Sequence, residues 1–314
     1  MPATLFATSL RTAFIAHSAK VVFGEIPQFR ALMNSFTSLS SQYFIEEFHG
    51  SKHQIYFDTS KPWLPRKRAR CELCDLLIIS YSTIEGLNVK MTLLQIKISQ
   101  SLYPSLGNGG IFGVDHVRFP ANFEQWDLLA NRPLLFPTSV FAPPTELLSK
   151  AVVPSVGSFG VFHRNALKNV DFFYSSADCV APVGSPTTLR GRLETSVTSP
   201  YIRRIAGYID VTYCASLFMF GYSLYRLEIG TPVVSTSDSG HMTYHEPLAG
   251  WIRGILEKHV STSTASSGMA DEVLSKMRGD DVLPTYFAGA LPSVLLLRGE
   301  AAPRADGLQE TTLK

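Results

Sequence analysis

Residues 71–99 constrain the fold more than any other stretch of the chain. Two apolar runs, 73–80 and 89–98, are rich in leucine and isoleucine, and each is too short for a typical helix. The segment between them, 84–88, contains a glycine and an asparagine, which tolerate the positive φ angles of tight turns. The pattern predicts a β-hairpin made of two buried strands.

Charged side chains interrupt this apolar hairpin. Asp75 begins the first strand, and Lys97 stands near the end of the second. A turn centred between positions 86 and 87 would place Asp75 opposite Ile98, with Gln95 and Lys97 close by. Gln95 and Lys97 point to one face because strand side chains alternate. Isolated buried charges cost several kcal/mol, so we expect these groups either to pair with each other in a structural salt bridge or to hold a metal ion.

Asp75, the turn and the sequence Gln95-Ile96-Lys97 together resemble the PD-(D/E)XK nuclease superfamily, which includes many restriction and repair endonucleases. In that family an aspartate begins one strand and Glu-x-Lys or Asp-x-Lys closes the next. The match covers about thirty residues directly and extends over 29–138 if flanking elements are counted. Gln95 departs from the usual pattern, since most members have a carboxylate there. The resemblance implies an α+β or α/β fold with a restriction-endonuclease-like core, a central mixed β-sheet flanked by helices, and additional C-terminal α/β elements.

A glutamate from the helix before the first strand often joins the metal site in this family. Apolar spacing predicts a helix over 26–48, ended by Gly50, with Glu46 and Glu47 in its last turn. Carboxylates are disfavoured at that end of a helix dipole. Either glutamate therefore resembles the family's ligand, and a solvated helix end is the alternative.

The cofactor that the resemblance implies is Mg²⁺ or Mn²⁺, which oxygen ligands bind. The implied ligands are Asp75, Gln95, the Ile96 carbonyl and Glu47, and the implied catalytic residues are Asp75, Gln95, Lys97, Glu47 and Glu46.

A basic segment leads into the strand that bears Asp75. Arg66, Lys67, Arg68 and Arg70 cluster within five positions, close to Trp63. Such a segment is typical of a phosphate-binding surface, and we expect nucleic-acid contacts here. A solvated, purely structural loop is the alternative.

Elsewhere the patterns predict a strand over 53–58, a helix over 121–131, strands over 158–163 and 170–174, and a buried helix over 201–227. We divide the chain into a nuclease-like core with N-terminal helices (1–140), the remainder of the sheet with a buried helical lobe in the same globular unit (141–260), and a linker, short helix and flexible tail (261–314).

Composition limits the class of protein. With 314 residues, 45% of them apolar, the chain can bury a sizeable core. The formal net charge is only +2, so any nucleic-acid surface must be a local patch. Four cysteines embedded in apolar sequence indicate reduced packing residues. The longest uncharged run, 211–225, is shorter than the roughly twenty residues that span a bilayer. We expect a cytoplasmic protein without a membrane partner.

The leading functional prediction is a metal-dependent nuclease that hydrolyses nucleic-acid phosphodiester bonds, with DNA favoured over RNA. By resemblance alone, restriction or phage defence is the favoured setting, with a homo-oligomer or a partner protein of a defence system. The alternative is a nucleic-acid-binding or interaction module that keeps the nuclease fold without hydrolysis, and Gln95 is the feature that supports it.

Overall fold

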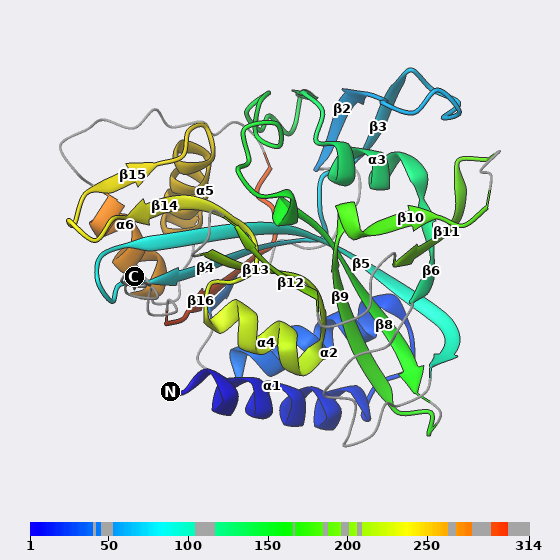
Figure 1. Ribbon diagram of the computed structural model, residues 1–314, viewed down its shortest axis with the longest axis horizontal. Helices are drawn as coiled ribbons and strands as arrows, with labels where there is room; N and C mark the ends of the chain where they lie inside the picture. Colours follow the sequence, from blue (N-terminus) through cyan, green and yellow to red (C-terminus); the bar gives the residue numbers. More distant parts are fainter. Residues whose placement is uncertain are drawn as a thin grey trace, which may run out of the picture.

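The computed structural model describes residues 1–39, 42–44, 53–103, 117–165, 167–184, 188–195, 201–205, 209–262, 268–277 and 290–300. Within these ranges the protein is a mixed α+β structure whose central mixed sheet is flanked by helices (Figure 1). The general class predicted from the sequence is therefore confirmed. The helices are α1 (Ala3–Ser18), α2 (Glu25–Thr37), α3 (Phe123–Asn131), α4 (Leu217–Tyr225), α5 (Leu248–Thr262) and α6 (Gly268–Met277), with 3-10 turns η1 (Pro154–Val156) and η2 (Ala177–Cys179).

The described strands form one ten-stranded sheet and two three-stranded sheets. The large sheet follows the order β1 (Gln42–Phe44), β16 (Val294–Arg298), β4 (Leu76–Ser82), β5 (Asn88–Tyr103), β8 (Gly157–Asn165), β9 (Val170–Ser176), β13 (Ile209–Ser216) and β12 (Tyr201–Ile205), and β14 (Thr231–Thr236) pairs with β5 and with β15 (Met242–Tyr244). One small sheet is β3 (Arg68–Glu72), β2 (Gln54–Asp58) and β7 (Leu135–Phe136), and the other is β10 (Val180–Pro182), β11 (Arg190–Thr195) and β6 (Arg118–Asn122). Pairing in the large sheet is parallel between β16 and β4 and between β5 and β8.

Both faces of the large sheet are buried, because strand side chains alternate between two hydrophobic cores. Leu76 and Ile78 of β4 pack into the core formed with α1, α2 and α4. Leu77 and Ile79 pack into the larger core on the opposite face, which also includes residues of α3, α5 and α6. Figure 1 shows α1, α2 and α4 together on one side of the sheet, with the small sheets and α3 on the other.

The predicted hairpin is present as β4 and β5, but its register differs from the expected one. Leu76 pairs with Leu94, and Ser82 pairs with Asn88. The turn is therefore centred on position 85, where Glu85 and Gly86 have positive φ angles of 56° and 97°. Asp75 lies just before β4 and contacts the backbone of Leu94 and Ile96, so the prediction that it faces Ile98 is wrong.

Two predicted helices are also corrected. The helix expected over 26–48 ends at Thr37, and β1 follows it because those residues pair with β16. The segment 201–227 contains two paired strands, β12 and β13, and only its last part is the helix α4. β-Branched and aromatic residues in 209–213 favour a strand over the helix that hydrophobicity alone suggested. The strands expected over 53–58, 158–163 and 170–174 and the helix expected over 121–131 are confirmed, apart from small shifts at their ends.

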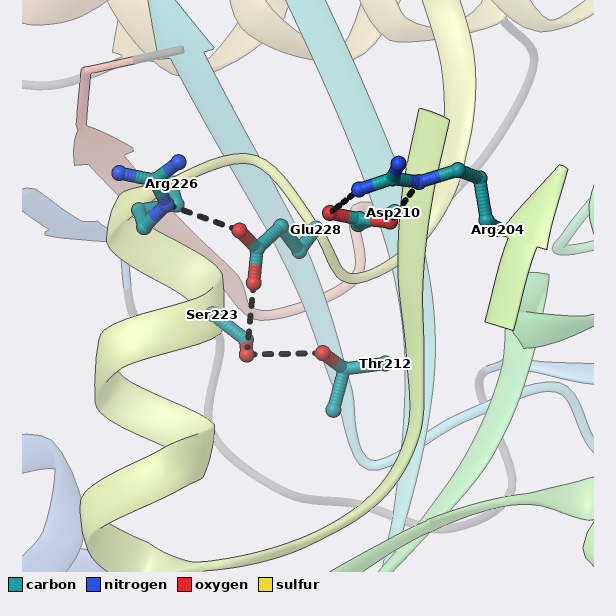
Figure 2. Close-up of polar contacts among 6 residues, drawn as sticks. All are labelled: Arg204, Asp210, Thr212, Ser223, Arg226 and Glu228. Carbon is teal, nitrogen blue, oxygen red and sulfur yellow. Dashed lines mark hydrogen bonds and ion pairs between the residues drawn. The ribbon is translucent and has the colours of Figure 1, made fainter. Parts of the chain in front are cut away.

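A buried polar network joins α4 to β13 (Figure 2). The Glu228 carboxylate accepts hydrogen bonds from Arg226 Nε at 2.8 Å and from Ser223 Oγ at 3.1 Å. Ser223 Oγ in turn lies 2.8 Å from Thr212 Oγ1. The Thr212 backbone N–H also donates to the Glu228 carbonyl at 2.7 Å, so the chain after α4 is fixed against the strand before it.

All four cysteines are buried, and none of them forms a disulfide in the part of the chain that the structure describes, in agreement with the expectation of packing residues. Among the described residues, no helix combines the length and hydrophobicity that a membrane span requires.

Candidate active site

Asp75 lies in the short connection between β3 and β4, where its backbone and carboxylate both contact β5. Its N–H donates to the Leu94 carbonyl at 3.0 Å, and its Oδ2 accepts from the Ile96 N–H at 2.6 Å. Burial raises the pKa of the Asp75 carboxyl, whereas the positive charge of Lys97 and the Ile96 hydrogen bond lower it. The carboxylate is therefore held in one orientation beside the backbone that joins Gln95 to Lys97.

Gln95 and Lys97 lie two residues apart on β5 and point to one face of the sheet, and the charge of Lys97 acts on the Asp75 carboxyl. The Gln95 side chain is fully buried, and its Oε1 accepts from Lys97 Nζ at 3.4 Å. Lys97 Nζ also donates to the Ile96 carbonyl at 2.8 Å. Gln95 Nε2 is buried without a hydrogen-bond partner among the described residues, which is costly for an amide group. The structure thus brings together the three residues on which the resemblance rests.

Glu72, at the end of β3, is a carboxylate that the sequence analysis missed. Burial and, to a smaller extent, the nearby Asp75 charge raise its pKa to about 7, against the opposing effect of Lys97. A carboxyl with this pKa exchanges its proton near neutral pH. The sequence signal that could have identified it is its position three residues before Asp75, at the end of the basic segment.

Glu25, in the first turn of α2, is the second carboxylate that was missed. Its pKa is raised by burial of the carboxyl and by Asp75, with Lys97 again opposing the shift, although the residue as a whole is exposed. Glu25 and the following Pro27 are typical of a helix start, which the longer helix predicted over 26–48 obscured. Glu46 and Glu47, the predicted helix ligands, lie outside the described residues.

The basic segment is largely occupied by contacts within the protein. The Arg66 guanidinium forms a bidentate ion pair with the buried Glu124 carboxylate of α3. Arg68 pairs with Asp58 at 3.0 Å and lies over the Phe136 ring, 4.4 Å from its centroid. Arg70 lies over the Tyr56 ring at 5.4 Å, and Lys67 is exposed. Arg66 and Arg68 therefore have partners within the protein.

The oxygen donors at the site fit a hard divalent cation. In the part of the chain that the structure describes, no three His, Cys, Asp or Glu side chains form a metal-binding group by themselves. Mg²⁺ does not need such a group, because it commonly uses one or two carboxylates and completes its shell with water and substrate phosphate. The Asp75 charge raises the pKa values of Glu72 and Glu25, and the Glu25 charge also raises that of Glu72, so a bound cation would relieve this repulsion.

No protein-family model, no curated protein and no solved structure matches this chain.

Proposed function

We propose that this protein is a metal-dependent nuclease of the PD-(D/E)XK type, with a restriction-endonuclease-like core, and that it hydrolyses phosphodiester bonds of DNA. The observation that supports it best is the convergence of Asp75, just before β4, with Gln95 and Lys97 of the neighbouring strand β5. The carboxylate of Asp75 is hydrogen-bonded to the backbone between the other two. Restriction or phage defence is the setting that the resemblance favours.

In this proposal Asp75 and the Gln95 amide oxygen hold Mg²⁺ or Mn²⁺ together with water. When bound, the ion supplies electrophilic polarisation of the phosphate and a more acidic water. Lys97 Nζ, held by the Ile96 carbonyl, stabilises negative charge that develops on the phosphate oxygens. Glu72 accepts the proton of the attacking water, since its pKa of about 7 suits a general base at neutral pH.

The test is cleavage of double-stranded DNA in Mg²⁺ or Mn²⁺ by the wild-type protein and by two nearly isosteric variants. Asp75→Asn keeps an oxygen that can accept the Ile96 hydrogen bond, and Lys97→Met keeps the length of the side chain. Each should reduce the cleavage rate at least about a hundredfold, as loss of a charge-stabilising group does in other active sites. Asp238→Asn, at an exposed position in the turn between β14 and β15, is the matched control and should cleave like the wild type. Wild-type rates in both site variants would refute the proposal.

A second candidate is a nucleic-acid-binding module that keeps the fold without hydrolysis. The observation in its favour is that Lys97 Nζ contacts both Gln95 Oε1 and the Ile96 carbonyl, while Asp75 accepts from Ile96. Apart from Gln95 Nε2, these groups satisfy one another without a ligand. On this account the wild-type protein binds DNA without cleaving it in either metal, and Asp75→Asn leaves the binding unchanged.

A further inference from the structure

The sheet formed by β10, β11 and β6 has one face packed on the protein and one face open to solvent. In β6 the residues alternate between exposed and buried, with Phe119 and Ala121 facing inward. In β11 Leu193 faces inward, and a Cβ added at Gly191 would collide with the Phe123 ring. The absence of a side chain at Gly191 lets β11 approach α3 closely, which directs the neighbouring Arg190 and Arg192 outward.

The charged residues on the open face of this sheet are Arg118, Arg190, Arg192 and Glu194. Arg118 Nε and Glu194 Oε1 form an ion pair at 2.7 Å across the strand pair. Arg190 and Arg192 stand opposite the uncharged residues Asn122 and Pro120, so neither arginine has an acidic cross-strand neighbour in this strand pair. The face is therefore locally cationic in a protein whose net charge is only +2.

This cationic face begins beside the candidate active site. The Ser99 hydroxyl of β5 donates to the Arg118 carbonyl of β6 at 2.6 Å. Ser99 follows Lys97 by two residues and points to the same side of the strand, a separation of about 7 Å. Figure 1 shows β6 and β11 next to this end of β5, whereas α5 and α6 lie at the far end of the sheet.

We propose that Arg190 and Arg192 bind the phosphate backbone of duplex DNA next to the scissile phosphate. The inference rests on the proposed function and adds the surface that positions the substrate. Residues i and i+2 of a strand are about 7 Å apart, and the phosphates of one DNA strand advance by about 3.4 Å per nucleotide along the helix axis, so neighbouring phosphates lie within reach of both side chains. Both guanidiniums can therefore contact one strand, and they contribute affinity without reading the base sequence.

The experiment measures binding of a fluorescent 30-base-pair duplex by anisotropy, in EDTA and in the Asp75→Asn background, so that cleavage has no influence. The variant is Arg190→Gln with Arg192→Gln, and the matched control is Lys258→Gln with Lys276→Gln on α5 and α6, which removes two exposed cations from the far end of the protein. The salt slope is the slope of the logarithm of the binding constant against the logarithm of the salt concentration. Losing two phosphate contacts lowers its magnitude by about 1.8, so the affinity advantage of the parent over the arginine variant shrinks about 12-fold between 50 and 200 mM salt.

Replacing both arginines with lysine should restore the parent slope, because a phosphate contact needs the charge and not the guanidinium shape. Equal slopes and affinities for the arginine variant and the lysine control would overturn the inference, as would a parent protein that does not bind the duplex. If the arginine variant loses binding while the wild-type protein fails to cleave DNA, the binding surface stands and the nuclease proposal alone fails.

Discussion

The substitution Gln95→Glu tests whether the site is built for a cation, because it adds the carboxylate that the resembling family usually has. Gln95 is fully buried, and Asp75 contacts the backbone of both its neighbours, Leu94 and Ile96. We take the two carboxylates to be about 5 Å apart, the separation of directly opposite side chains in an antiparallel pair. At an effective dielectric constant of about 20, two negative charges at that distance repel by about 3 kcal/mol.

Without metal, at pH 8, Gln95→Glu should therefore lower the free energy of unfolding by about 3 kcal/mol, less whatever Lys97 offsets. Saturating Mg²⁺ should recover most of that loss, because the added charge strengthens cation binding to the folded state. The assay is urea unfolding of the wild type and the variant, with and without Mg²⁺.

Gln125→Glu is the matched control, because Gln125 is also buried but lies on α3. None of the charges that shift the pKa values of Asp75, Glu72 and Glu25 comes from that helix. Its loss of stability should not respond to Mg²⁺. If Gln95→Glu behaves like this control, the reasoning about a cation site is wrong.

Three further predictions follow from individual contacts. Between pH 4.5 and about 7, the free energy of unfolding of the metal-free wild type should fall by up to about 3 kcal/mol relative to that of Glu72→Gln. The reason is that the folded state keeps the Glu72 proton after the unfolded chain has released it. Urea unfolding of both proteins across this pH range measures the difference. Arg66→Ala should destabilise the protein by about 2 kcal/mol in thermal or urea unfolding, since it leaves the buried Glu124 carboxylate without its ion pair, and an unchanged midpoint would contradict this. Glu228→Ala should lower the free energy of unfolding by about 1–3 kcal/mol, because it removes the carboxylate that accepts from Arg226 Nε and Ser223 Oγ. Glu228→Gln should lower it less, because the amide keeps one oxygen.

The sequence predicted the hairpin and the residues that meet on it, because short apolar runs bounded by a turn have few other solutions. It did not predict the register. A turn of five residues allows several pairings, and the one adopted depends on the positive φ of Glu85 and on the close contact of Gly86 with Thr236. That register brings Asp75, just before β4, against the backbone of Leu94 and Ile96.

Glu25 could not be assigned to the site from the sequence, because only the tertiary structure brings the start of α2 to Lys97, and the one signal for Glu72 was its position three residues before Asp75. The helix pattern also continued past Thr37 into β1, where pairing with β16 overrides local preference. In the segment after 201, hydrophobicity indicated burial correctly but did not distinguish two strands from a helix.

Calorimetric titration of Mn²⁺ into the wild-type protein and into Asp75→Asn at pH 8 tests the central claim most directly. The account predicts saturable binding of one or two ions by the wild type and its loss in the variant, since the carboxylate charge of Asp75 is the group that β5 holds in place. Equal binding by both proteins, or none by the wild type, would contradict it.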